Sequence, residues 1–520
     1  MRGPGAWGSS RSVEGYRRFQ AAKRRNKLVN NAEKAVEALF NPRRMAIVGA
    51  SSNLAKWGNI IPSNILRDGY KGELYLVNPR GGKLKGIPFH PSLAGIGKEI
   101  DLAMITIPAE GVEGVMEDCA RAGVKVAIVI SGGFSESSPE GRAMEENLVR
   151  TAHLHGIRLV GPNTMGITSA PWSLTALMPP VRPRAGHVAF AAQSGNLGTQ
   201  MLGWGSYRGI GFSRFVCVGN ECDLDFADYL EYFARDEETR AILLYVEGFK
   251  RPRRILELAE EITPHKPIVI YKAGGTRAGS RAAASHSAAM AGSREIYGGM
   301  IRQAGMIRAE TTEEMLDFSD ALVKLPAPRG RRTAILSWGG GWAVVAADLC
   351  ERAGLDVAPL PDEAREELAS LLPSYWSKGN PVDMVGILDL DKHVRCLEIL
   401  SRCPEYDAVV SLGTINAAGA FGLAGREAEG EHVGDLEKAR RHYVQERSAA
   451  FARRVVELIE EQGKPIITVG MPQRDADSVN LSGYPWERIS IYTNPERAAR
   501  VTAMLAERGE YLRSVAARGA

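Results

Sequence analysis

Short apolar runs that alternate with amphipathic helical patterns restrict the fold of this chain more than any other feature. The runs MAIVGA, LYLVNP, AMITIP, VAIVIS and RLVGPN follow one another early in the sequence, and segments with helical spacing, such as AEGVEGVMEDCARAG, lie between them. Strands that alternate with helices are typical of a parallel sheet that carries helices on both faces. The pattern therefore predicts an α/β fold that begins with a Rossmann-like domain.

The length of the chain predicts several domains. At roughly 100–200 residues per domain, 520 residues correspond to about three domains. The proline-rich segments MPPVRPRAG and LPAPRGRR mark two boundaries between apolar units. We expect a basic N-terminal extension over residues 1–40, a Rossmann-like domain over 41–172, and two flavodoxin-like parallel α/β domains over 183–326 and 330–520, the last with a C-terminal helix.

The second and third domains share an order of motifs that indicates an internal repeat. Each begins with a strand, a loop of small residues and a helix; the loop is QSGN in the second domain and WGGG in the third. A Gly-Asn pair and an Asp follow, in GNECD and GNPVD, and each domain then has a closing strand that begins with KPI. The spacing between these motifs differs between the two copies, so the copies share the order of their elements and do not repeat the sequence itself. Polar residues that stand in only one copy are therefore the better candidates for chemistry.

Composition excludes several classes of protein. A net charge of +4 on this length gives no reason to expect nucleic acid or a membrane as the main partner, and no apolar run reaches the ~18–20 residues of a membrane span. Six cysteines without CxxC spacing indicate neither a metal site nor a disulfide framework. The first 27 residues are basic but lack the apolar core of a secretory signal; a transit peptide or a nucleic-acid-binding arm remains an alternative, and the cytoplasm is the expected location.

The loop GASSNLAKWG follows the first predicted strand but lacks a full GxGxxG pattern. The second strand ends at Asn78-Pro79, where a NAD-binding domain would carry an acidic residue for the ribose. A NAD-linked oxidoreductase is therefore a weak hypothesis. A nucleotide-like ligand that needs no such acid, or a domain with a tight turn alone, stays open.

Two polar residues of the second domain have no counterpart in the third. Glu247 ends the strand AILLYV, and His286 stands in the small-residue segment AAASHSAAMAG after the next strand. Neighbouring parallel strands end at the same edge of a sheet, so the two side chains could meet there. A carboxylate fixes the tautomer of an adjacent imidazole and raises its basicity, as a nucleophilic histidine requires. The alternative is a surface histidine and an unrelated glutamate.

The loops QSGN and WGGG each join a strand to a helix. A helix start offers unpaired N–H groups and the positive end of a dipole, which favour an anion. Two such starts that face one point, together with His286, would suit phosphoryl transfer through a phosphohistidine. Tight packing is the alternative explanation for either loop alone. The candidate phosphate-binding residues are Ser194, Gly195, Asn196, Gly339, Gly340 and Gly341.

Seven motifs together resemble one known family. They are AIVGASSNLAKWGN, GYKGELYLVNPR, GPNTMGI, QSGNLG, SHSAAMAG, GNPVDM and YTNPERAARV, and they run from about Asn41 to the C-terminal helix. In this order they resemble the alpha subunit, or the alpha-like half, of NDP-forming acyl-CoA synthetases. This is the acetate–CoA ligase (ADP-forming) group, in the succinyl-CoA synthetase superfamily.

The resemblance implies a reaction and a site. The first domain would bind coenzyme A, His286 would carry the phosphoryl group, and Glu247 would support it. The reaction would interconvert acyl-CoA, ADP and phosphate with a small carboxylic acid, CoA and ATP, through an acyl phosphate and a phosphohistidine. The implied CoA-binding residues are Gly49, Ala50, Ser51, Lys56, Asn78, Pro79, Ile107 and Pro108.

The chain departs from the family pattern at several points. Ser287, Ala288 and Met290 replace the common residues around the histidine, and Trp338 and Trp342 flank the third-domain loop, which leaves the acyl group open. No segment supplies an ATP-grasp module. We therefore expect a hetero-oligomer with a separate ATP-grasp beta subunit that holds ATP or ADP and Mg. A CoA-binding or acyl-CoA-binding regulatory protein without turnover is the alternative.

Overall fold

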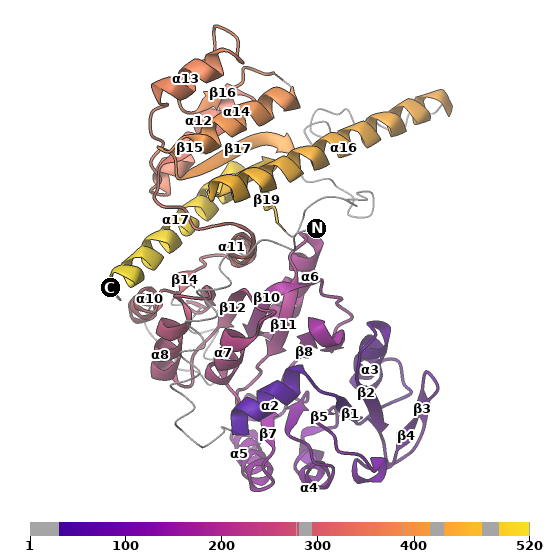
Figure 1. Cartoon of the computed structure of the whole chain (residues 1–520). Coiled ribbons are helices and arrows are strands. Elements are labelled where there is room, and N and C mark those ends of the chain that lie inside the picture. Colours follow the sequence, from indigo (N-terminus) through magenta and orange to yellow (C-terminus); the bar gives the residue numbers. More distant parts are fainter. Residues whose placement is uncertain are drawn as a thin grey trace. The chain divides into compact units, whose positions relative to one another are not determined.

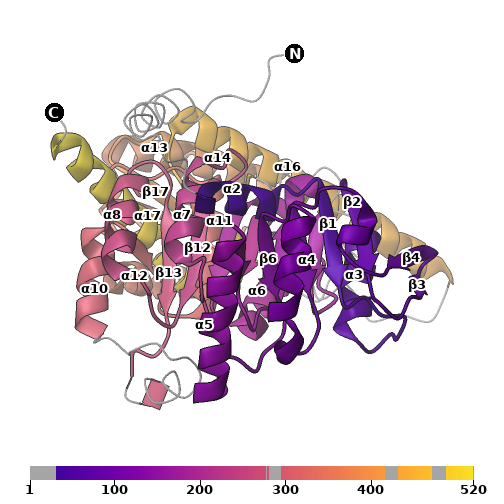
Figure 2. The same ribbon diagram turned by 90° about the horizontal axis from the view of Figure 1, so that it is seen from below.

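The computed structural model describes residues 31–276, 278–279, 294–387, 389–415, 431–470 and 488–518. Two compact units divide the chain between Met315 and Leu316. Three mostly parallel sheets form the fold, two in the first unit and one in the second, and helices flank each of them (Figure 1; Figure 2). In the described part of the chain, no helix combines the length and the apolar character needed to cross a membrane.

The first sheet has the order β3-β4-β2-β1-β5-β6-β7 and is parallel except for the β3–β4 hairpin. Its central strands are fully buried apolar runs, as expected of strands that helices cover on both faces. The strands are β1 (Arg44–Val48), β2 (Glu73–Val77), β3 (Lys83–Leu84), β4 (Ile87–His90), β5 (Leu102–Ile105), β6 (Val126–Val129) and β7 (Arg158–Val160). The helices around it are α3 (Trp57–Arg67), α4 (Met116–Arg121) and α5 (Pro139–Leu154).

The second sheet has the order β14-β13-β12-β10-β11-β8-β9, with an antiparallel edge formed by β8 and β9. The strands are β8 (Gly166–Ser169), β9 (Leu174–Leu177), β10 (Ala185–Ala192), β11 (Phe212–Cys217), β12 (Ala241–Val246), β13 (Ile268–Lys272) and β14 (Ile307–Arg308). The helices are α6 (Gly195–Tyr207), α7 (Phe226–Arg235), α8 (Pro252–Ile262), α10 (Arg294–Gln303) and α11 (Thr312–Lys324), and α11 continues into the second unit.

The third sheet, in the second unit, has the parallel order β16-β15-β17-β18-β19. The strands are β15 (Thr333–Ser337), β16 (Val382–Asp383), β17 (Ala408–Ile415), β18 (Ile466–Gly470) and β19 (Ile491–Tyr492). The helices are α12 (Gly340–Arg352), α13 (Asp362–Ala369), α14 (Leu390–Arg402), α16 (Glu431–Gln462) and α17 (Pro495–Arg518).

The five parallel strands of the second sheet and the five of the third share one topology. Numbered along the chain, the strands of each set lie in the order 2-1-3-4-5, which is the flavodoxin-like arrangement. In this arrangement ligands bind beyond the carboxyl ends of the first and third strands, where the winding direction reverses. The predicted fold class is confirmed, and the topology selects the loops after β10 and β12, and after β15 and β17, as places for a site.

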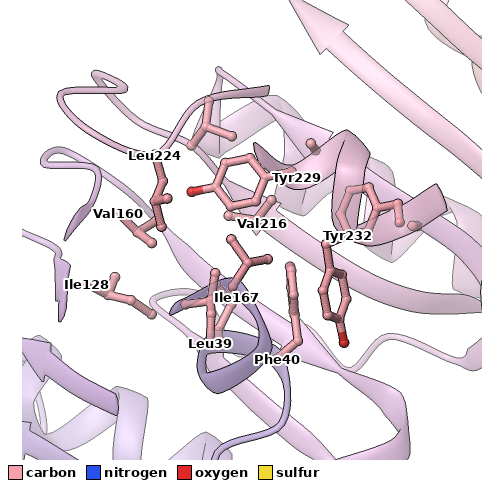
Figure 3. Close-up of a cluster of buried hydrophobic side chains, with 14 of the residues drawn as sticks. Leu39, Phe40, Ile128, Val160, Ile167, Val216, Leu224, Tyr229 and Tyr232 are labelled. Carbon is pink, nitrogen blue, oxygen red and sulfur yellow. The ribbon is translucent and has the colours of Figure 1, made fainter. Parts of the chain in front are cut away.

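The two sheets of the first unit share one apolar core. Figure 3 shows Ile128 and Val160 of the first sheet facing Ile167 and Val216 of the second. The helix α2 (Asn31–Phe40) packs against strands of both sheets and against α7. Its Leu39 and Phe40 are buried in this core, as Figure 3 shows. The last ten residues of the predicted extension 1–40 are therefore part of the folded unit.

Candidate active site

The candidate CoA-binding residues gather at one edge of the first sheet. They lie on the loops that follow β1, β2 and β5, and these three strands are neighbours in the sheet. Gly49 turns the chain away from β1 with φ of 92°, and a Cβ at this position would come within 2.8 Å of Ile107 and of Thr106. A side chain would therefore be strained and crowded there. The neighbouring Thr106, whose hydroxyl donates to the carbonyl of Val48 at 3.0 Å, was missed by the sequence analysis.

Asn78 ties two of these loops together. Its Nδ2 donates to the carbonyl oxygen of Ala50 at 2.7 Å, and its Oδ1 accepts from the backbone N–H of Arg80 at 2.9 Å. An aspartate at this position would place a negative oxygen against the carbonyl of Ala50. Asn78, which stands where a NAD-binding domain would carry an acidic residue, thus fixes the shape of the loop after β1.

The start of α6 has the backbone geometry expected of an anion site, but its glycine has a packing role. Ser194 is the N-cap, and its hydroxyl accepts from the N–H of Leu197 at 3.4 Å. A Cβ on Gly195 would lie 2.3 Å from the side chain of Met165 and 3.1 Å from the sulfur of Cys217. Tight packing therefore accounts for Gly195. Asn196 beside it is exposed, and its side-chain oxygen accepts from Nε2 of Gln200 at 3.0 Å.

The start of α12 differs from that of α6 in its surroundings. The N-cap is Gly339, and no described atom lies within 4 Å of the place that a Cβ would take on Gly339 or Gly341. A Cβ on Gly340 would come within 2.9 Å of a carboxylate oxygen of Asp383. An acidic side chain thus borders this helix start, where the dipole favours negative charge. The two helix starts lie in separate units, and each is described by itself.

Trp338, next to this helix start, is held by a buried histidine. Its indole N–H donates to Nδ1 of His393 at 2.5 Å, and Nε2 of His393 lies 2.9 Å from the hydroxyl of Ser411. Burial lowers the pKa of His393 to about 3. His393 is therefore neutral at physiological pH and carries its proton on Nε2, because Nδ1 accepts the indole N–H.

Glu247 directly follows β12, at the switch point of the second sheet. Its backbone N–H donates to the side-chain oxygen of Gln193, which follows β10, and its carbonyl accepts from Nζ of Lys272 at 2.6 Å. Burial lowers the pKa of Lys272, and the charge of Glu247 opposes this shift. The strands β12 and β13 pair in parallel with Val246 opposite Lys272, so the segment after β13 leaves the sheet beside Glu247.

His286 lies outside the described residues, together with Ser287, Ala288 and Met290. The segment that contains them follows β13, and the adjacency of β12 and β13 agrees with the strand arrangement predicted from the sequence. The approach of His286 to Glu247 stays a prediction.

Glu221, on the loop after β11, is a second acid that the sequence analysis missed. It is 4% exposed and has φ of 52°, which is uncommon for a residue other than glycine. Burial and the nearby charge of Asp225 raise its pKa to about 8. Its carboxyl accepts from Nε2 of Gln193 at 2.6 Å and from the N–H of Phe226 at 3.2 Å. The positive φ and burial of a carboxyl group are not visible in a sequence pattern.

Two families match adjoining parts of the chain. A CoA binding domain matches residues 43–170, and a succinyl-CoA ligase like flavodoxin domain matches residues 185–322. Over 481 residues the chain is 40% identical to acetate–CoA ligase (ADP-forming) I subunit alpha of Pyrococcus furiosus, and the match spans 91% of this chain and 97% of that subunit.

Two further comparisons extend the similarity. Over 398 residues the chain is 38% identical to acetate–CoA ligase (ADP-forming) I of Archaeoglobus fulgidus, where the match spans 76% of this chain and 58% of that longer protein. A solved structure of acetyl-coenzyme A synthetase 1 from Candidatus Korarchaeum cryptofilum, in complex with phosphate and ADP, superposes with a TM-score of 0.80 at 33% identity. It covers 94% of this chain and 99% of that one.

Proposed function

Because the chain belongs to the family of ADP-forming acetate–CoA ligase alpha subunits, we propose that it is the CoA-binding, phosphohistidine-carrying subunit of an ADP-forming acyl-CoA synthetase. Coenzyme A is a substrate of this reaction, and its nucleotide chemistry is that of ADP and ATP. The observation that carries the proposal is a match along nearly the full length of a relative named as an alpha subunit. It favours the enzyme over a regulatory CoA-binding protein.

The proposed reaction begins at the thioester. Inorganic phosphate attacks the carbonyl carbon of the acyl-CoA, the C–S bond breaks, and CoA leaves as the thiol after it takes a proton. A ring nitrogen of His286 then attacks phosphorus, and the bond from phosphorus to the acyl oxygen breaks to release the carboxylate. Finally a β-phosphate oxygen of ADP attacks phosphorus, the P–N bond breaks, and ATP forms. Each step is reversible.

Glu247 supports the histidine in this proposal. Its carboxylate accepts a hydrogen bond from one ring nitrogen of His286 and thereby keeps the other nitrogen basic. The position of Glu247 after β12, with its backbone held by Gln193 and Lys272, supports this role. The helix starts at Ser194, Gly195 and Asn196 and at Gly339, Gly340 and Gly341 would bind the phosphate.

We further propose that the first domain, over residues 41–172, binds CoA at the edge where β1, β2 and β5 end. Gly49, Ala50, Ser51 and Lys56 would lie near its phosphates, and Asn78, Pro79, Ile107 and Pro108 would line the rest. The gathering of these loops at one sheet edge supports the assignment. Residues 183–326 and 330–520 would form the two ligase domains.

A partner subunit completes the proposed enzyme. Relatives of similar length are named alpha subunits, and a longer relative bears the ligase name with no subunit designation. We propose that a separately encoded ATP-grasp subunit binds Mg and the nucleotide, that the two chains form a hetero-oligomer, and that the segment with His286 carries the phosphoryl group between sites.

Labelling with [γ-³²P]ATP tests this function. The wild-type chain, mixed with its ATP-grasp partner, should acquire label that is lost in acid and retained in base, as expected of phosphohistidine. His286→Ala should acquire none, whereas His155→Ala, which changes an exposed histidine on another loop, should be labelled like the wild type. Equal labelling of wild type and His286→Ala would remove the role given to His286.

A further inference from the structure

The side chain of Gln193 joins three loops at the edge of the second sheet. Its Oε1 accepts from the backbone N–H of Glu247 and from that of Gly248 at 3.0 Å. Its Nε2 donates to the carbonyl of Gly248 at 2.9 Å and to the carboxyl of Glu221 at 2.6 Å. One amide therefore links the loops after β10, β11 and β12.

These contacts fix the orientation of the amide. A glutamine side chain offers two donors and an oxygen with two lone pairs, and here all four positions are used. A flipped amide would direct its N–H groups at the N–H groups of Glu247 and Gly248. Its oxygen would then face the carboxyl of Glu221 and the carbonyl of Gly248. Only one orientation satisfies every group.

The consequence for Glu247 is a backbone that is held from both sides. Gln193 holds its N–H and the following N–H, and Lys272 holds its carbonyl. Hydrogen bonds that fix the groups around a functional side chain keep that side chain in the position that the reaction requires. Gln193 is also the residue immediately before Ser194, so the same residue connects the start of α6 to Glu247.

Glu221 in turn fixes Gln193. It is held in a left-handed backbone conformation, and its second oxygen accepts from the N–H of Phe226, the first residue of α7. Burial is the largest cause of the raised pKa of Glu221; the charge of Asp225 also raises this pKa, and that of Lys250 lowers it. Strained residues of this kind persist where the surrounding structure determines them, often beside functional sites.

We propose that Gln193 is a positioning residue for Glu247, and that Glu221 sets the orientation of its amide. The inference rests on the proposed function, because Glu247 is taken as the acid that supports the phosphohistidine. Gln193 itself touches neither substrate nor phosphoryl group in this assignment. Gln193 acts on the reaction indirectly, because it holds the backbone N–H groups of Glu247 and Gly248 in place.

The test uses the complex of the chain with its ATP-grasp partner and [γ-³²P]ATP. Gln193→Leu removes all four hydrogen bonds, and Gln193→Glu replaces the two donors by an oxygen that faces Glu221 and Gly248. Both changes should lower the rate of histidine labelling roughly tenfold to hundredfold, since small misplacement of a supporting group costs this much. The KM for CoA in acyl-CoA formation should stay within about twofold of the wild type, because the CoA loops lie on the other sheet.

A double variant separates positioning from general destabilisation. Glu221→Gln added to Gln193→Glu restores an amide opposite a carboxyl group and should recover a large part of the labelling rate. The matched control is Gln303→Leu, which removes a surface hydrogen bond to Glu260 in the same domain and should label normally. Melting temperatures of all variants report on folding.

The outcomes are distinguishable. Wild-type labelling rates in both Gln193 variants would overturn the inference and leave the proposed function intact. So would a loss that follows the melting temperature in every variant and is not recovered by the double change. An unlabelled wild-type complex, or equal labelling of His286→Ala, would overturn the proposed function and with it this inference.

Discussion

At the scale of single residues, the site depends on polar groups whose roles come from their surroundings. Gln193, Glu221 and Lys272 are ordinary polar residues in the sequence, and their importance appears only when the sheet brings three loops together. Glu247 was predicted as a candidate because it ends an apolar strand in one copy of the repeat. Hydrogen-bond networks between loops distant in sequence leave no comparable pattern, so the groups that hold Glu247 could not be predicted.

Glu221 should make the stability of the first unit depend on pH. Its pKa is raised from 4.5 to about 8 by burial and by Asp225, so the folded state favours the protonated form. The stabilising contribution of the proton is complete below pH 4.5 and is lost as pH rises through about 8. Glu221→Gln removes this titration, so the difference between the free energies of unfolding of wild type and variant should change by up to about 5 kcal/mol over this pH range. A difference that is constant with pH would contradict the assignment.

Trp338 offers a second residue-scale prediction. Trp338→Phe keeps the aromatic ring but removes the N–H that Nδ1 of His393 accepts, which leaves a buried nitrogen without its partner. The expected cost is about 1–3 kcal/mol in the stability of the second unit, measured by denaturant unfolding. The control Trp342→Phe changes a residue that is 47% exposed and should cost less than about 0.5 kcal/mol. Equal effects of the two changes would mean that the hydrogen bond contributes nothing.

At the scale of elements, the strands could be predicted and their packing partners could not. The apolar runs located β1, β5, β6, β10, β12 and β15, because buried parallel strands need continuous apolar residues. The helix α2 was assigned to the extension over residues 1–40, because the alternation of apolar strands and helices begins only after it. Its buried face meets residues more than a hundred positions away, and periodicity identifies an apolar face without saying what covers it.

Phe40 tests the role of α2. Its ring stacks on Tyr232 at 5.1 Å between centroids, and the guanidinium of Arg214 lies 5.9 Å from it. Phe40→Ala should lower the free energy of unfolding of the first unit by about 3–5 kcal/mol, because the cavity lies in the core shared by two sheets. Leu154→Ala, at a side chain that is 84% exposed, is the control and should have little effect in the same denaturant titration. If Phe40→Ala also has little effect, α2 is not part of the core.

At the scale of the whole molecule, each of three mostly parallel sheets carries candidate residues for the proposed reaction at one of its edges. The repeated order 2-1-3-4-5 explains why the second and third domains share motifs, and the switch points explain why the candidate residues fall where they do. The sequence could predict these edges because strands and loops are local. The relation between the two helix starts depends on how separate units come together, and a sequence pattern carries no information on that.

We propose that this chain transfers a phosphoryl group in acyl-CoA synthesis and does more than bind CoA. The most direct measurement supplies acetyl-CoA, ADP and phosphate to the chain and its ATP-grasp partner, and follows ATP and free thiol together. We expect equal amounts of ATP and free thiol from the mixture, and neither product from either chain alone or from a mixture that contains His286→Ala. A mixture that binds CoA yet forms neither ATP nor free thiol from any acyl-CoA offered would contradict it.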